Sequence, residues 1–246
     1  MNSNPQDGTS VKKYGLALHT ASRELGLAIS NFAGDSRCKT WNLDRDLATH
    51  LHQYLVEFIG PQTWADLAFI AVAKGPGGFT GTRMGMVTAR TLAQQLDIPV
   101  FAISTLAAVA WAQPPPAKGL LELEPPQPPL GKGGLLSAQP PVASGGLLSI
   151  ALQMPAQRGQ LFGAVYSVNK DSGLTELFPD TVMTAESWQE KLESWENSYQ
   201  LIEVGSELGW SVSSVLELAY LEWKQGSRPD WSGALPFYGQ HPVKGH

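Results

Sequence analysis

The chain has 246 residues, of which 43% are hydrophobic, so it can form one large domain or two small ones, and we favour two. Seventeen basic and 22 acidic residues give a net charge of −5, and the scattered basic residues argue against a nucleic-acid surface of its own. A single cysteine, Cys38, excludes an internal disulfide. No apolar run approaches the ~20 residues of a membrane span, and the N-terminus resembles no secretion signal. We therefore expect a cytoplasmic protein without membrane contact.

The first part of the chain alternates strand and helix patterns. Three strands are predicted over 14–19, 25–32 and 37–43, and together they favour an antiparallel meander. A helix over 46–59 is expected next because its apolar residues recur at helical spacing. The remaining predicted elements are a strand over 67–73, a glycine-rich turn, a helix over 81–96, a strand over 98–103 and a short helix over 105–112.

The composition changes abruptly between Gln113 and Gly146, where proline and glycine dominate. Such a segment predicts a disordered insertion at 113–146. Beyond it the earlier order returns, with strands over 147–154, 161–169 and 174–178, a helix over 184–195, a strand over 199–204 and a helix over 212–223. The sequence therefore predicts an α/β protein with two β-β-β-α-β-α lobes, an N-terminal lobe at 1–112 and a C-terminal lobe at 147–246.

The most distinctive stretch is the turn Gly75-Pro-Gly-Gly-Phe-Thr-Gly-Thr-Arg83 between strand 67–73 and helix 81–96. It has neither standard nucleotide-loop spacing. A strand, turn and helix in this order leave unpaired N–H groups at the helix N-terminus, where an anion is favoured. The candidate phosphate or nucleotide loop comprises Gly75, Gly77, Gly78, Thr80 and Gly81.

This turn resembles the Gly-Pro-Gly-Ser-Phe-Thr-Gly-x-Arg signature of the TsaB (YeaZ) family, and the similarity continues through Leu92–Leu106. The resemblance implies the two-lobed actin-like, Hsp70-like and sugar-kinase (ASKHA) fold. It also implies a non-catalytic subunit of tRNA threonylcarbamoyladenosine synthesis, which binds the transferase TsaD and presents a surface for the ATPase TsaE. Family members form a homodimer when TsaD is absent, and tRNA is expected only through the complex.

Two departures from the family pattern concern catalysis. His19 stands after the first strand, where relatives usually have Asp, and Pro155 stands where an Asp-Ala-Arg is usual. We therefore expect no catalytic residue and no cofactor of its own, with weak ATP or ADP binding in the cleft between the lobes as an open alternative. The rival functions are a small-molecule kinase or ATPase of the same superfamily, which would need an acid near strand 14–19, and a degenerate homodimeric scaffold.

The spacing of the histidines does not indicate a metal site, and the sequence contains no motif for nucleophilic catalysis. His50 and His52 lie two residues apart and diverge on a helix, so no metal site is predicted. No Gly-x-Ser-x-Gly elbow occurs, and Cys38 has no histidine close in sequence.

Helix 81–96 carries small residues every fourth position, at Gly81, Gly85, Ala89 and Ala93. This stripe either packs on the protein's own sheet or lets a partner helix approach closely. The resemblance implies that helices 46–59 and 81–96 pair with TsaD. The candidate interface residues are Leu47, Leu51, Tyr54, Gly81, Met84, Gly85, Thr88 and Ala89.

Overall fold

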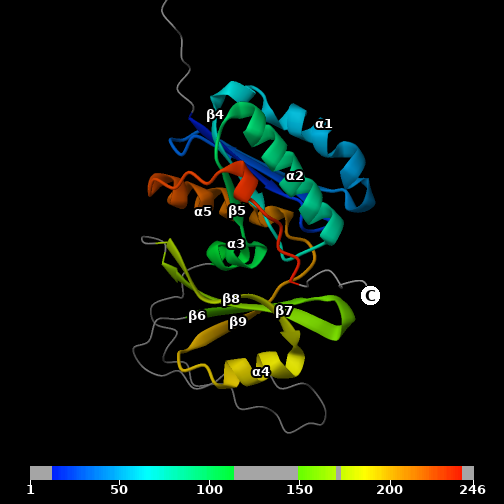
Figure 1. Ribbon diagram of the computed structural model, residues 1–246, viewed down its shortest axis with the longest axis vertical. Coiled ribbons are helices and arrows are strands. Elements are labelled where there is room, and N and C mark those ends of the chain that lie inside the picture. The colour runs from blue at the N-terminus through cyan, green and yellow to red at the C-terminus, as the bar shows by residue number, and fades with distance from the viewer. Residues whose placement is uncertain (1–12, 114–148, 170–172, 240–246) are drawn as a thin grey trace, which may run out of the picture. The chain divides into compact units, whose positions relative to one another are not determined.

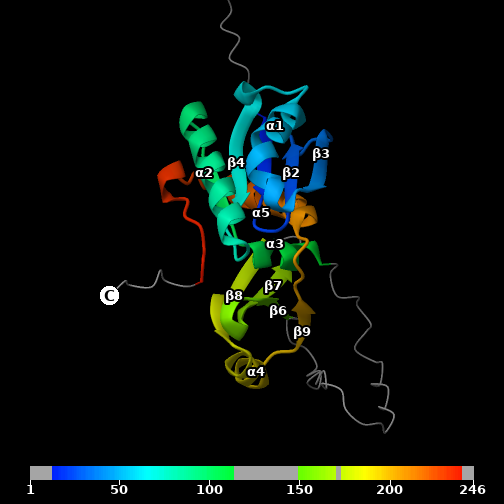
Figure 2. The same ribbon diagram turned by 90° about the vertical axis from the view of Figure 1, so that its right-hand side faces the viewer.

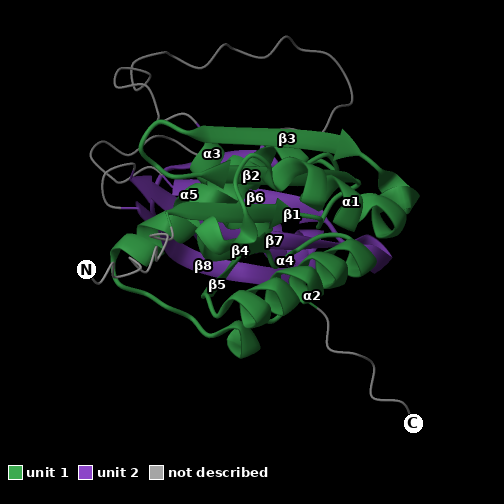
Figure 3. Ribbon diagram, turned by 90° about the horizontal axis from the view of Figure 1, so that it is seen from above, with its two compact units in different colours: residues 1–112, 205–246 green, residues 113–204 purple. Residues whose placement is uncertain are grey.

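The computed structural model describes residues 13–113, 149–169 and 173–239. The chain forms two compact units, which Figure 3 shows in different colours. Unit 1 contains residues 1–112 and 205–246, and unit 2 contains residues 113–204. Apart from Gln113, the insertion predicted at 113–146 lies outside the described residues.

Unit 1 is built on a five-stranded sheet in the order β3-β2-β1-β4-β5. Its strands are β1 (Tyr14–His19), β2 (Glu24–Ser30), β3 (Ser36–Asn42), β4 (Leu67–Ala73) and β5 (Val100–Ile103). β2 is antiparallel to both β1 and β3, which confirms the predicted meander, and β4 is parallel to both β1 and β5. The carboxyl ends of three parallel strands therefore lie at one edge of the sheet.

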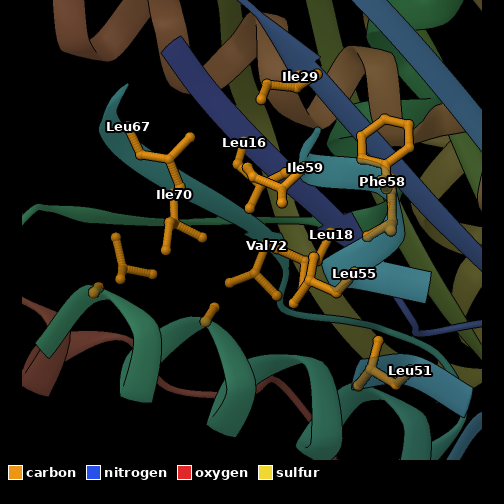
Figure 4. Close-up of a cluster of buried hydrophobic side chains, with 14 of the residues drawn as sticks. Leu16, Leu18, Ile29, Leu51, Leu55, Phe58, Ile59, Leu67, Ile70 and Val72 are labelled. Carbon is orange, nitrogen blue, oxygen red and sulfur yellow. The ribbon is translucent and has the colours of Figure 1, made fainter. Parts of the chain in front are cut away.

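Two helices cover one face of this sheet, α1 (Leu47–Ile59) and α2 (Phe79–Leu96). Figure 4 shows how leucines of α1 meet Leu16 and Leu18 of β1, both of which are fully buried. On the opposite face lie α3 (Thr105–Ala112) and α5 (Val212–Lys224). The central strands β1 and β4 are almost continuously apolar because helices bury both faces of the sheet.

The position of α5 differs from the sequence prediction, which placed this helix in the C-terminal lobe. α5 packs on β1, β2 and β4 of unit 1 instead, after the chain has left unit 2. Val212, Val215 and Ala219 are fully buried on α5. An amphipathic pattern predicts a helix with one buried stripe, but it does not say which sheet buries that stripe.

Unit 2 has a four-stranded sheet in the order β8-β7-β6-β9. Its elements are β6 (Ser149–Pro155), β7 (Gln160–Asn169), β8 (Gly173–Thr184), α4 (Ala185–Glu193) and β9 (Tyr199–Glu203). Trp188 and Leu192 of α4 pack on Ala151 and Val165 of the sheet. A Cβ on Gly163 would lie only 2.7 Å from the nearest atom of the Trp188 ring. The helix is thereby seated directly on the backbone of β7.

Arg37 on the edge strand β3 caps the C-terminus of α1. Its guanidinium donates 2.9 Å hydrogen bonds to the carbonyl oxygens of Phe58, Ile59 and Gly60. It also lies 5.2 Å from the centre of the Phe58 ring. These carbonyls have no partner within the helix, and the helix dipole favours a cation at this end.

We expect Arg37→Ala to lower the free energy of unfolding by about 1–2 kcal/mol, because charge-assisted bonds and a ring contact are lost together. Urea unfolding followed by circular dichroism measures the change. The control is Arg23→Ala, since Arg23 forms a 3.9 Å ion pair with Asp44 that is largely exposed. Such a surface pair contributes less than about 1 kcal/mol. Equal losses in the two variants would contradict the capping role of Arg37.

Candidate functional site

The glycine turn lies against the loop that follows β1, which we call the β1 loop (Thr20–Ala21). The backbone N–H of Gly78 donates to the carbonyl oxygen of Ala21 at 2.7 Å. The hydroxyl of Thr20 donates to the carbonyl oxygen of Gly81 at 2.8 Å. Two segments about sixty residues apart are thus joined where the phosphate loop was predicted.

The glycines of the turn are required by the closeness of this contact. A Cβ on Gly77 would lie 2.1 Å from the Ala21 carbonyl oxygen. A Cβ on Gly81 would lie 2.1 Å from the Thr20 carbonyl oxygen, and one on Gly85 would lie 2.0 Å from the Thr20 hydroxyl. Gly77 and Gly81 therefore make room for the backbone of the β1 loop, and Gly85 makes room for the Thr20 side chain.

The small-residue stripe of α2 is accordingly an internal packing surface. Gly81 and Gly85 meet the β1 loop, while Ala89 and Ala93 are fully buried in the core of unit 1. Of the two interpretations of this stripe, packing on the protein's own sheet and loop is the one that the contacts support.

The other predicted interface residues are either buried or half-buried in unit 1. Leu47 and Leu51 are buried in the core, and Thr88 is also buried. Tyr54 and Met84 are half-buried, and the Tyr54 ring stacks on Trp41 with centroids 4.8 Å apart. In this structure of the single chain, most of the predicted residues stabilise unit 1 itself.

Exposed apolar side chains on α1 and α2 lie at positions that sequence reasoning missed. Val56 is 63% exposed, whereas Phe79 and Val87 are each 55% exposed. α1 and α2 lie beside each other on the same face of the sheet (Figures 1 and 2). Val56 and Val87 fall outside the buried stripes of their helices, and this offset is the signal that could have identified them. We call Val56, Phe79 and Val87 the exposed apolar residues of α1 and α2.

His19, at the carboxyl end of β1, is fully buried, and neither ring nitrogen has a hydrogen-bond partner among the described residues. Burial lowers the pKa of the His19 imidazole to about 4. The ring is therefore neutral at pH 7. A buried neutral imidazole thus occupies the position after the first strand where the kinase or ATPase alternative would need an acid.

Other chemistry has little support within the described ranges 13–113, 149–169 and 173–239. They contain no group of three or more His, Cys, Asp or Glu residues that could hold a metal ion. Cys38 is exposed on the edge strand β3. Weak ATP or ADP binding stays a prediction, which titration calorimetry with Mg-ATP would check. Among the helices that the structure describes, none combines the length and apolar character needed to cross a membrane.

Comparison with known proteins finds local similarity around this site. The family model described as "TsaD: tRNA N6-adenosine threonylcarbamoyltransferase" matches residues 59–125, which include the glycine turn and α2. The chain is 56% identical over 45 residues to the tRNA threonylcarbamoyladenosine biosynthesis protein TsaB of Bacillus subtilis, a match that covers 18% of this chain and 20% of that protein. It is 22% identical over 162 residues to TsaB of Buchnera aphidicola from Acyrthosiphon pisum, covering 65% and 61%.

The solved structures extend the likeness to the whole fold. A Pseudomonas aeruginosa protein described as uncharacterized with similarity to peptidase YeaZ superposes with a TM-score of 0.65 and 19% identity. This superposition covers 93% of this chain and 100% of that protein. YeaZ from the same organism gives 0.63 and 18%, covering 92% and 99%. The α/β fold predicted from the sequence is confirmed by these structures. The local identity to TsaB proteins supports the resemblance to the TsaB (YeaZ) family, although the chain covers only about a fifth of the length of the first two TsaB relatives.

Proposed function

We propose that this chain is a TsaB-type subunit that binds TsaD and activates it for threonylcarbamoylation of adenosine in tRNA. The observation that carries the proposal is the identity to proteins named for tRNA threonylcarbamoyladenosine biosynthesis, together with the TsaD family match over 59–125. Among the described residues, that matched region includes β4, the glycine turn and α2 of unit 1. The subunit supplies a surface and no reacting group.

The surface for TsaD in this proposal is the outer side of α1 and α2. Its apolar members are Val56, Phe79 and Val87, which a solitary chain leaves in water. Exposed apolar groups on two neighbouring helices are a feature of interaction surfaces. Gly85 and Ala89 support that surface from beneath by letting α2 lie close to the β1 loop and the sheet. TsaE, which docks on the assembled complex, and a homodimer in the absence of TsaD are further parts of the proposal.

Val87→Glu is the variant that tests the surface. A carboxylate at a position 55% exposed leaves the fold intact, but it would have to be desolvated when an apolar partner covers α2. We expect the affinity for TsaD to fall at least tenfold, measured by titration calorimetry with purified TsaD. Ala89→Glu would be a poor test, because Ala89 is fully buried and the charge would unfold unit 1.

The matched control is Leu201→Glu in β9 of unit 2, where the side chain is 44% exposed. It introduces the same charge in place of an apolar side chain, and TsaD affinity should stay unchanged. If Val87→Glu and Leu201→Glu bind TsaD equally tightly, α2 is not the docking surface.

Activity is tested by reconstitution with TsaD, TsaE, tRNA, ATP and a source of threonylcarbamoyl-adenylate. Threonylcarbamoyladenosine formation should depend on this chain and should persist in His19→Leu, because His19 is buried and touches no substrate in this proposal. A modification rate that is the same with and without the chain would exclude the activator function. Slow hydrolysis of Mg-ATP by the chain alone would favour the kinase or ATPase alternative.

A further inference from the structure

The segment after α5 crosses back over unit 1 to the glycine turn, and we call residues 229–238 the C-terminal strap. Figure 2 shows it as the red ribbon beside α2. It begins at the sheet edge, where the N–H of Val100 in β5 donates to the Pro229 carbonyl oxygen at 3.2 Å. In its middle, Ala234 is 4% exposed within the core of unit 1, and the Arg90 guanidinium of α2 lies 5.9 Å from the Trp231 ring centre.

The strap ends directly on the glycine turn. The backbone N–H of Phe237 donates to the carbonyl oxygen of Lys74 at 2.6 Å. A ring contact lies next to this hydrogen bond. The centre of the Tyr238 ring lies 4.6 Å from the centre of the ring of Phe79, the first residue of α2. The strap therefore touches the turn at both its entry and its exit into the helix.

Gly75 is the residue that makes room for the strap. Its φ of +100° is a backbone conformation that L side chains rarely adopt. A Cβ at this position would lie 2.5 Å from the Phe237 carbonyl oxygen. The turn is thus held by two separate segments, the β1 loop at Gly77, Gly78 and Gly81 and the strap at Gly75.

The β1 loop and the C-terminal strap differ in how deeply their residues are buried in unit 1. The β1 loop continues from a buried central strand, with Thr20 0% exposed and Ala21 2% exposed. The last part of the strap has Leu235 63% exposed and Phe237 and Tyr238 half-buried. A segment with few buried side chains opens at a low free-energy cost compared with the core.

We propose that the C-terminal strap is a releasable clamp on the glycine turn and that the seated strap favours docking of TsaD on α2. The effect on docking rests on the proposed function. When the strap is seated, it holds the turn and the first residues of α2 in one conformation and fixes the Phe79 ring. When it is released, residues 75–82 open locally and Phe79 loses its support. Docking of a partner on α2 then costs the free energy of ordering this segment again.

The clamp is tested on the isolated chain by amide hydrogen exchange of a peptide that covers 75–82. Phe237→Pro removes the N–H that bonds to Lys74, whereas Phe237→Ala removes only the ring and keeps that donor. We expect exchange in 75–82 to be roughly tenfold faster in Phe237→Pro than in Phe237→Ala, the change that corresponds to about one hydrogen bond. Leu235→Ala, at an exposed strap position, is the control and should exchange as the parent does.

Exchange in β1 reports whether unit 1 of a variant is folded, because that strand is central in its sheet and its residues Leu16–His19 are fully buried. Equal exchange of 75–82 in Phe237→Pro and Phe237→Ala, with β1 protected in both, overturns the clamp.

The effect of the strap on TsaD docking is tested by removing the contact between the rings of Tyr238 and Phe79. Tyr238→Ala removes the ring that packs on Phe79, and we expect a threefold to tenfold lower affinity for TsaD. Unchanged affinity in Tyr238→Ala, with faster exchange in Phe237→Pro, overturns the docking role and supports the clamp. If the parent chain itself does not bind TsaD, the proposed function fails, and the exchange result still decides the clamp by itself.

Discussion

Gly81→Ala is expected to lower the free energy of unfolding by about 3 kcal/mol, because a methyl group is forced against backbone that has no room to move. The added Cβ would lie 2.1 Å from the Thr20 carbonyl oxygen and 3.4 Å from the Leu47 side chain. Relief requires α2 to move away from the β1 loop, which would lengthen the hydrogen bond from the Thr20 hydroxyl to the Gly81 carbonyl oxygen. Urea unfolding monitored by circular dichroism measures the loss.

Gly78→Ala is the matched control three residues earlier. A Cβ at Gly78 would find its nearest neighbour, the Ala21 carbonyl oxygen, at 3.7 Å, and the φ of −62° suits any residue. The expected change is within about 0.5 kcal/mol, as for other substitutions that disturb no packing. Similar destabilisation in both variants would show that contact with the β1 loop is not what selects glycine at position 81.

The same pair separates packing from ligand binding. If the turn served chiefly to bind phosphate, Gly81→Ala would leave stability unchanged and weaken nucleotide binding. We expect instead that Gly81→Ala lowers the free energy of unfolding, because atoms of the β1 loop occupy the space beside Gly77, Gly81 and Gly85.

The second large effect is a loss of stability below neutral pH caused by His19. Its pKa is about 4 in the folded chain because of burial, against about 6.5 in an unfolded chain. Above pH 6.5 the ring is neutral in both states and adds no pH dependence. As the pH falls from about 6.5 to about 4, only the unfolded state binds the proton, so unfolding is favoured by about 3 kcal/mol in total. Below pH 4 both states are protonated and the contribution stops changing.

His19→Leu should remove this part of the pH dependence. Carboxylates also titrate at the acid end of the range, so the informative quantity is the difference between parent and variant in free energy of unfolding from pH 7 to pH 4. The control is His52→Gln, because His52 is exposed on α1 and its loss should leave the parent's curve unchanged. Parallel curves for the parent and His19→Leu would show that the His19 ring is not buried as neutral imidazole.

Local pattern predicted most of the secondary structure of this chain, but the strand predicted over 174–178 runs to Thr184 as β8, because its pairing with β7 continues that far. Alternating and continuous apolar runs predicted every strand of unit 1, and helical spacing from Leu47 to Phe58 predicted α1 with its end near Gly60. Periodicity succeeds there because it reflects which side of an element is buried, and that is encoded within the element. The motif from Gly75 to Arg83 likewise carries the resemblance to the TsaB (YeaZ) family within nine consecutive residues.

Tertiary structure decided what the sequence pattern could not distinguish. The stripe of Gly81, Gly85 and Ala89 looks the same whether it meets a partner helix or the β1 loop, and the contact with Thr20 selects the loop. The helix α5 was predicted correctly as a helix and assigned to the wrong lobe. The strap at Gly75 joins residues more than 150 positions apart, and no short-range pattern encodes such a pairing.

The amino-acid sequence by itself determined the strands, the helices, the glycine turn and the family resemblance of this protein. The folded chain decided which glycines face backbone, that the His19 ring lies buried and neutral, and which apolar side chains of α1 and α2 stay in water. The physical reason is that secondary structure follows from interactions within a few residues, whereas burial and pKa depend on which distant segments fill the surrounding space.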